Sequence, residues 1–243
     1  MKIEYEIKTN VGKIRKLNED NFLAIPSMNF FVVADGMGGH KCGEIASKIA
    51  VNTLKEILLL YKKNAEKNEE KMLIEAIAIA NNEIYEQSIK NEFAKGMGTT
   101  ITSVLIKNDV IYFANVGDSR TYLIRNSSIQ QKTDDHSWVY DQVKNNLLSK
   151  EEARVHKYRN IITRALGIEK NIKADIFKEN LQEGDILLLC SDGLNTMLED
   201  EKIKNIIIEN SNNLKKCCQK LIDEANNKGG EDNITIIVVK VKK

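Results

Sequence analysis

Short apolar runs separated by glycine and polar residues recur along the chain and predict β-strands. The first strand is indicated by Ile3, Tyr5 and Ile7, which alternate with charged residues as in a half-buried strand. Continuous apolar runs, which are typical of core strands, follow at 21–25, 30–34, 101–106, 110–115, 120–125, 185–190 and 234–239. Because short polar breaks separate the runs between 101 and 125, we expect hairpins and an antiparallel sheet there.

Apolar residues at helical spacing predict two pairs of helices. The first pair covers 45–58 and 73–84 and should pack as an antiparallel pair on a sheet, and the second covers 203–207 and 214–225. The positions expected to face the core in the first helix are Ile45, Ala46, Ile49, Ala50, Leu54, Ile57 and Leu58. Because strands and helix pairs segregate along the chain, the pattern favours an α+β layered domain over a doubly wound parallel sheet.

The segment 133–159 is polar, helical in pattern and the least core-like part of the chain. Ser149 and Glu152 have the spacing of a capping box, which predicts a helix start. His136 and His156 lie in this polar segment, and we expect both on the surface.

Length, charge and cysteine content limit the classes of function. A chain of 243 residues and 27.6 kDa fits one core, so we expect a single domain over 1–243 and a monomer. The net charge of +1, from 36 basic and 35 acidic residues, gives no global field that would favour nucleic acid or a membrane surface. No apolar run approaches the roughly 18 residues of a membrane span, and the start lacks the apolar segment of a signal peptide. We therefore expect a cytoplasmic protein, and its four cysteines, which lack metal-ligand spacing, fit reduced thiols.

Aspartates at strand ends supply the candidate chemistry. Asp35, Asp118 and Asp192 each end an apolar run beside a glycine, and Asp232 precedes the last run. One such residue is usually an ordinary turn, but four, with further acid at 19–20, are hard to explain as separate turns. Clustered carboxylates repel one another unless cations neutralise them. Because oxygen ligands suit hard ions, we expect magnesium or manganese rather than zinc.

A set of motifs in a fixed order covers nearly the whole chain. They are R-x-x-N-E-D from Arg15, VADGMGGH from Val33, GTT from Gly98, NVGDSR from Asn115, TDDHS from Thr133, ITRALG from Ile162, LLLCSDGL from Leu187 and GGEDNIT from Gly229. In these motifs the sequence resembles the metal-dependent protein phosphatases of the 2C family, in their compact bacterial form. The resemblance implies two antiparallel sheets between pairs of antiparallel helices, a metal site at one end, and a mobile flap at about 134–159.

The resemblance also implies roles for the acidic residues. Asp35 matches the family's carboxylate that bridges two metal ions, with the Gly36 carbonyl on one ion and Asp192 and Asp232 on the other. Asp118 matches a ligand of a third ion in bacterial members. The implied cofactors are two or three divalent ions, Mn or Mg.

Two further residues match positions of known role in the family, and two other positions differ from the family's pattern. Glu19 matches a position that holds metal-bound water, and Arg15 matches the arginine that binds the substrate phosphate. Met37 stands where many animal and plant members have a histidine, and Lys157 replaces a common flap proline. The proton donor for the leaving group is therefore either His40 or a metal-held water; we favour the water, with His40 starting the following helix.

The implied activity is that of a protein serine/threonine phosphatase, in which a water bridging two metal ions attacks phosphoserine or phosphothreonine. Its partners would be phosphorylated proteins in a signalling system with a cognate serine/threonine kinase. The main alternative is an inactive phosphatase-like module that binds phosphoproteins with the same fold. A cysteine phosphatase is excluded because none of the four cysteines has an arginine six residues later, and the P-loop motif G-x-x-x-x-G-K-[ST] is absent.

Overall fold

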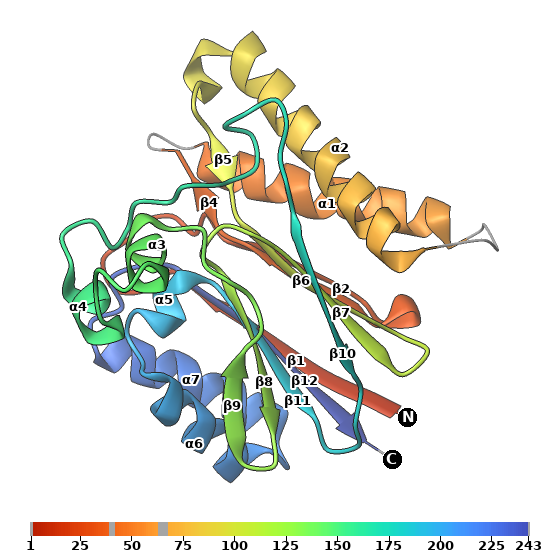
Figure 1. Ribbon diagram of the computed structural model, residues 1–243, viewed down its shortest axis with the longest axis vertical. Coiled ribbons are helices and arrows are strands. Elements are labelled where there is room, and N and C mark those ends of the chain that lie inside the picture. Colours follow the sequence, from red (N-terminus) through yellow and green to blue (C-terminus); the bar gives the residue numbers. More distant parts are fainter. Residues whose placement is uncertain (1, 39–41, 63–67, 243) are drawn as a thin grey trace.

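Two five-stranded antiparallel sheets form the centre of the protein (Figure 1). The computed structural model describes residues 2–38, 42–62 and 68–242. The first sheet has the order β1 (Lys2–Asn10), β12 (Ile234–Lys242), β11 (Ile186–Cys190), β8 (Arg120–Arg125) and β9 (Ser128–Gln131). The second has the order β10 (Asp175–Asn180), β7 (Val110–Val116), β6 (Ile101–Lys107), β3 (Phe30–Ala34) and β2 (Asn21–Ile25).

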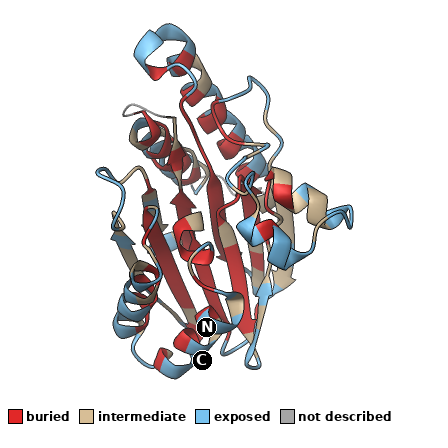
Figure 2. Ribbon diagram, turned by 90° about the vertical axis from the view of Figure 1, so that its left-hand side faces the viewer, coloured by how far each residue is buried: buried red, intermediate tan, exposed pale blue. Residues whose placement is uncertain are grey.

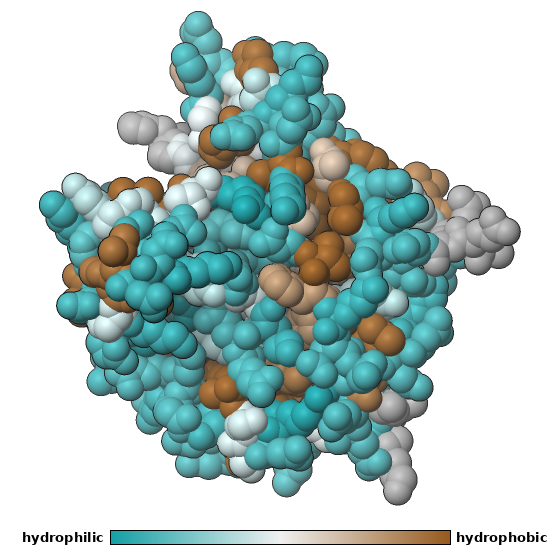
Figure 3. All heavy atoms as spheres, in the orientation of Figure 1, coloured by the Kyte–Doolittle hydropathy of each residue, from teal (hydrophilic) through white to brown (hydrophobic). Residues whose placement is uncertain are grey.

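A helix pair covers the outer face of each sheet. Helices α1 (Gly43–Tyr61) and α2 (Glu69–Lys90) pack on the second sheet, and α6 (Asp200–Asn210) and α7 (Leu214–Asn227) pack on the first. The predicted α+β sandwich of two antiparallel sheets between helix pairs is therefore confirmed. Where β10 runs beside the α1–α2 pair, the surface shows a brown, hydrophobic patch in Figure 3.

The continuous apolar runs are explained by burial of both faces of the central strands. In β3, Phe31 and Val33 belong to the core between the two sheets, whereas Phe30 and Val32 face the α1–α2 layer. Neither face can be polar, so the alternation that marks a half-exposed strand disappears. In Figure 2 these central strands are almost entirely red, which marks buried residues.

One position predicted for the helical core is wrong. Ile45 is 41% exposed, whereas Ala46, Ala50, Leu54 and Leu58 are fully buried. Adjacent helical residues point about 100° apart, so Ile45 lies toward the solvent side when Ala46 faces the sheet. The predicted stripe of the second helix, 73–84, is buried as expected.

Several short elements complete the chain. They are η1 (Pro26–Met28), β4 (Gly36–Met37), η2 (Glu92–Ala94), β5 (Gly98–Thr99), α3 (Trp138–Lys144), α4 (Lys150–Val155) and α5 (Asp192–Asn195). The predicted capping box is confirmed: the Ser149 side chain accepts from the backbone of Glu152, whose carboxylate accepts from the Ser149 backbone. Strands β9 and β10 were not predicted. None of the described helices has the length and apolar character needed to cross a membrane.

Candidate metal centre

The strand order brings the predicted aspartates to one end of the sandwich. Strands β3 and β7 both pair antiparallel with β6, so they run in the same direction and Asp35 and Asp118 follow neighbouring strand ends. In the other sheet β11 pairs antiparallel with β12, so Asp192, just after β11, lies beside Asp232, just before β12. The four candidates thus come from two different sheets.

The acidic side chains lie close enough to change one another's pKa. The Asp35 side chain lies near Asp192 and lowers the pKa of that carboxyl group, but burial has the larger, opposite effect. Burial, together with the charges of Asp20, Asp192, Asp118 and Asp232, raises the pKa of Asp35 well above its usual range. Burial and the charge of Asp232 raise the pKa of Asp192 to about 6. A cluster of this kind strongly favours a bound cation.

Asp20 belongs to the same cluster, although the sequence did not single it out. Its Oδ2 accepts a hydrogen bond of 2.8 Å from Ser191 Oγ. Burial raises the pKa of Asp20 to about 7, despite this hydrogen bond. The one signal in the sequence is its place at the end of the R-x-x-N-E-D motif.

The donor set fits a hard divalent ion. Asp20 Oδ1 and Asp118 Oδ1 are buried oxygens for which the described part of the chain provides no hydrogen-bond partner. Unpaired buried carboxylate oxygens are costly, and an ion would satisfy them. As they stand, no three His, Cys, Asp or Glu side chains of the described residues already converge at coordination distance.

Gly36 is required because the backbone is closely packed at this point. Its N–H donates to the Glu19 carbonyl at 3.2 Å. A Cβ at this position would lie 2.1 Å from the Gly43 carbonyl oxygen and 2.5 Å from that of Glu19, which no side chain can do. The main chain of the predicted metal ligand is thereby fixed between α1 and the 11–20 loop.

Hydroxyl groups hold the main chain of Asp35 in place. Thr100 Oγ1 accepts from the Asp35 N–H at 3.0 Å, and Thr99 Oγ1 donates to the Asp35 carbonyl at 2.8 Å. Thr100 in turn shares a hydrogen bond of 2.7 Å with Ser119. The GTT motif and the residue after Asp118 thus position the Asp35 backbone.

Asn233 anchors the loop that carries Glu19. Its Oδ1 accepts from the Glu19 N–H at 2.7 Å, and its Nδ2 donates to the carbonyls of Val11 and Leu17 at 2.9 Å each. Glu19 is half-buried, and burial, followed by the charge of Glu44, raises its pKa. Glu19 therefore faces the acidic cluster from a fixed loop.

Arg15 forms an ion pair with one of the predicted metal ligands. Its Nη2 donates to Asp232 Oδ2 at 2.8 Å, and about half of the Arg15 side chain, 51%, is exposed. The resemblance assigns these residues to the phosphate and to the metal, and the structure places them in contact. Arg15 therefore lies at the open side of the acidic cluster.

Comparison with known proteins gives a consistent result. Residues 15–225 match the family model described as protein phosphatase 2C. The serine/threonine phosphatase Stp of Listeria monocytogenes is 39% identical over 96% of this chain and 94% of its own length. The chain belongs to the protein phosphatase 2C family.

Solved structures agree with this assignment. The structure of serine/threonine phosphatase Stp1 from Staphylococcus aureus superposes with a TM-score of 0.92, at 34% identity, over 100% of this chain and 96% of that one. The catalytic domain of the serine/threonine phosphatase PstP, solved with two manganese ions, gives a TM-score of 0.89 at 30% identity over 99% of both chains. This 2C-family protein is therefore a metal-dependent serine/threonine phosphatase that acts on phosphoproteins.

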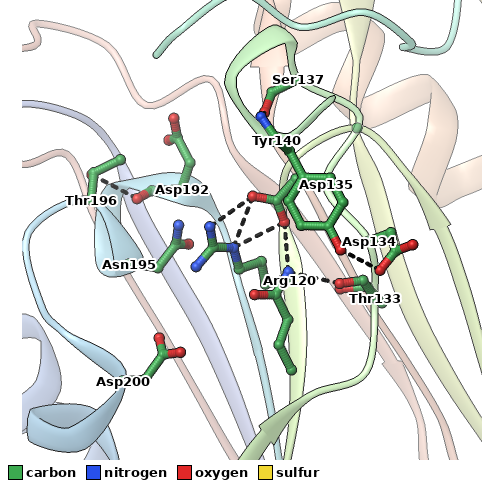
Figure 4. A network of polar contacts seen from close by, with 12 residues as sticks. Arg120, Thr133, Asp134, Asp135, Ser137, Tyr140, Asp192, Asn195, Thr196 and Asp200 are labelled. Atoms are coloured by element: carbon green, nitrogen blue, oxygen red, sulfur yellow. Dashed lines mark hydrogen bonds and ion pairs between the residues drawn. The ribbon is translucent and has the colours of Figure 1, made fainter. Parts of the chain in front are cut away.

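A buried ion pair ties the start of the 134–159 segment to β8 of this phosphatase (Figure 4). Arg120 binds Asp135 with both ends of its guanidinium group, at 2.9 Å from Nε to Oδ1 and 2.7 Å from Nη2 to Oδ2. Its Nη1 donates to Tyr122 Oη at 2.9 Å, and Tyr122 Oη donates to Asp200 at 3.0 Å. The cation also opposes the repulsion in the cluster, because its charge lowers the pKa of Asp192.

The surface position expected for His136 is wrong. His136 is 6% exposed; its Nδ1 accepts from the Gly117 N–H at 3.0 Å, and its Nε2 lies 3.0 Å from Asp175 Oδ2. Because Nδ1 accepts a hydrogen bond, a neutral ring carries its proton on Nε2, which faces Asp175. Burial lowers the pKa of His136, which agrees with a neutral ring. The residue fixes the loop before Asp118.

Three further residues from the sequence analysis are His156, Lys157 and His40. His156 is half-buried and stacks on Trp138 with ring centroids 5.0 Å apart. Lys157 is exposed, with its Nζ over the Tyr158 ring at 4.7 Å. His40 lies outside the described residues.

Proposed function

We propose that this phosphatase hydrolyses phosphoserine and phosphothreonine at the acidic cluster, where Asp35, Gly36, Asp192 and Asp232 hold two divalent ions. The observation that carries this assignment is one buried cluster of carboxylates from both sheets, in which the oxygens Asp20 Oδ1 and Asp118 Oδ1 have no hydrogen-bond partner among the described residues, together with raised pKa values that a cation would reverse. Bound ions would supply a water of lowered pKa as nucleophile and screen the phosphate charge.

The protein's own residues orient the phosphate. The Arg15 guanidinium group is partly exposed and lies beside Asp232, so it can turn two N–H groups toward phosphate oxygens while remaining next to the metal ligands. The Asn233 side chain fixes the loop on which Arg15 sits, through Val11 and Leu17. This arrangement aligns phosphorus without a covalent intermediate.

Three further carboxylates complete the proposed site. Asp118 would bind a third ion, which its unpaired Oδ1 supports, and Glu19 would hold water on an ion. We add Asp20, whose second oxygen is also unpaired. An all-oxygen set accommodates Mn or Mg.

The direct test of function is phosphate release from a phosphothreonine peptide with manganese, with and without EDTA. Release that EDTA stops and added manganese restores supports the assignment. The inactive phosphoprotein-binding alternative predicts binding of the peptide with no release in either condition. An inactive module would not need the pairing of a phosphate-binding arginine with metal ligands, which argues against it.

Arg15→Ala is expected to lower kcat/KM by one to two orders of magnitude, because charge-assisted bonds to phosphate are worth roughly 1.5 to 3 kcal/mol. The melting temperature should change little, since the pair with Asp232 is half-exposed. Steady-state kinetics on the peptide and thermal melting check both. Early melting with normal kcat/KM would instead make Arg15 a structural residue.

The setting of the enzyme follows from the same assignment. We propose one catalytic domain over 1–243 with a flap at about 134–159, active as a cytoplasmic monomer in signalling. Its substrates would be phosphoproteins made by a cognate serine/threonine kinase. Two contacts from the later part of this segment support a flap beside the site: Arg159 pairs with Glu231 at 3.0 Å, next to Asp232, and Arg154 donates to the Thr196 carbonyl at 3.4 Å.

A further inference from the structure

A groove lies directly beside the proposed metal centre, and none of the roles assigned above uses it. It is lined by Met37 and by residues of the 162–173 segment, with a volume of about 270 Å³. Met37 directly follows Gly36, the proposed metal ligand, so their Cα atoms are about 3.8 Å apart. The groove therefore begins one residue away from the reaction site.

Five of the ten residues that line the groove are apolar, and we call this part of the lining its floor. Met37, Ile162, Ala165, Ile168 and Ile172 all contribute to its lining. Ile168 is 46% exposed, so its side chain is accessible to a ligand in the groove.

Gly98 lets two of these side chains come together. A Cβ at residue 98 would lie 3.0 Å from both Met37 Cε and Ile168 Cδ1. Met37 and Gly98 face each other in the β4–β5 pair. The apolar wall is therefore built across a strand pair that extends from the proposed metal centre.

The other five lining residues are polar, and we call this part the rim: Thr163, Arg164, Glu169, Asn171 and Lys173. Arg164 is held by Nη1, which lies 2.9 Å from Asp175 Oδ1 and 3.2 Å from the Lys173 carbonyl. For the residues that the structure places, no hydrogen bond involves Arg164 Nε or Nη2. The guanidinium group is thus fixed in position and still has N–H donors to offer.

We propose that this groove binds an aliphatic side chain of the phosphoprotein substrate, from a residue a few positions away from the phosphorylated one. The inference rests on the proposed function, and it makes Met37 and Ile168 determinants of substrate choice. An extended peptide advances about 3.3 to 3.6 Å per residue, so its neighbouring side chains reach the groove when its phosphate is at the acidic cluster.

Size and polarity favour a peptide segment over a small-molecule ligand. Sites for drug-sized ligands are roughly 300 to 1,000 Å³, which is larger than the 270 Å³ found here. A space of this size suits one branched aliphatic side chain, and the Arg164 donors at the rim suit the carbonyl groups of a peptide backbone.

The test is a set of phosphothreonine peptides with alanine at every flanking position, in which one position at a time, from −4 to +4, is changed to leucine. With saturating manganese, leucine at one or two positions should raise kcat/KM roughly tenfold over alanine, as expected for burial of a large aliphatic side chain. An aryl phosphate, measured in parallel, normalises for the concentration of active enzyme.

Ile168→Glu should reduce the leucine-to-alanine ratio from about ten to about one, because a charge in the apolar floor opposes burial of leucine. The matched control is Ile74→Glu, since Ile74 on α2 is equally exposed, at 45%, and does not line the groove. That variant should keep the wild-type ratio. Circular dichroism verifies that both variants are folded.

The outcomes separate the groove from the function on which it rests. Active wild-type enzyme with no preference for leucine at any position overturns the groove proposal and leaves the phosphatase assignment intact. The same holds if Ile168→Glu keeps the preference. No metal-dependent release from any peptide or from the aryl phosphate overturns both.

Discussion

Asp192→Asn is expected to lower turnover on a phosphothreonine peptide by several orders of magnitude and leave the protein folded. An amide is a weaker ligand than a carboxylate for a hard ion, so metal affinity and the nucleophile are lost together. Asp35→Asn should behave in the same way, because Asp35 belongs to the same acidic cluster and is a proposed ligand of the ions. Steady-state kinetics at saturating manganese measures the loss.

Asp192→Asn should not destabilise the metal-free protein. Burial and the charge of Asp232 raise the pKa of Asp192 from 3.8 to about 6. A raised pKa contributes stability below about pH 3.8, and this stability is lost as pH rises through about 6. At pH 7.5 the ionised Asp192 therefore destabilises the metal-free fold, and asparagine should keep or raise its melting temperature.

Asp223→Asn provides the control, because Asp223 is an exposed aspartate on α7 that contacts only Gln219 among the described residues. It should keep wild-type activity and melting temperature. If Asp192→Asn retained more than about a tenth of wild-type turnover, the two-metal mechanism would be wrong for this protein.

The strands and their aspartates could be predicted because local pattern and topology agree. Strands β2, β3 and β8 begin and end at the predicted residues, because polar or turn residues bound the apolar residues of each one. Within each sheet, the strand directions put Asp35 and Asp118 at one edge and Asp192 beside Asp232. The approach of Asp35 to Asp192 depends on how the two sheets stack, which the strand pattern does not predict.

Two of the edge strands, β9 and β10, could not be predicted from periodicity. Strand β10, Asp175–Asn180, pairs only with β7 and has no fully buried residue. Its sequence DIFKEN has neither a continuous apolar run nor a clean alternation. Pairing with β7 defines this strand, and pairing is a long-range property.

Polar contacts between residues far apart in the chain could not be predicted from the sequence either. Asp20 meets Ser191, 171 residues away, and Arg15 meets Asp232, 217 residues away. His136 has the polarity of a surface residue, yet Gly117 and Asp175 satisfy both ring nitrogens in the interior. A buried polar residue is recognisable only when its partners are known.

Asp135→Asn is expected to destabilise the protein by about 3 to 5 kcal/mol, the cost of leaving one member of a buried ion pair without its partner. The Asp135 side chain is 7% exposed and that of Arg120 is 21% exposed. Asparagine keeps the shape but removes the charge that balances the guanidinium group. Urea unfolding gives the free energy of unfolding.

An exposed ion pair serves as the control for the effect of burial on the Arg120–Asp135 pair. Lys202 and Glu224 lie 3.2 Å apart with side chains 51% and 39% exposed, so Glu224→Gln should cost less than about 1 kcal/mol. Replacing both members of the buried pair, as Arg120→Met with Asp135→Leu, should recover much of the stability lost by Asp135→Asn alone. A cost for Asp135→Asn no larger than that of the surface control would show that water reaches the pair.

Asp135→Asn should affect the metal centre as well as the stability of the fold. Arg120 holds Asp135 at the base of the proposed flap, and its charge lowers the pKa of Asp118 and Asp192. In Asp135→Asn the guanidinium group loses its fixed orientation between the flap base and α5. Manganese affinity, measured by calorimetry on the folded variant, should therefore change together with the free energy of unfolding, whereas Glu224→Gln should leave both at their wild-type values.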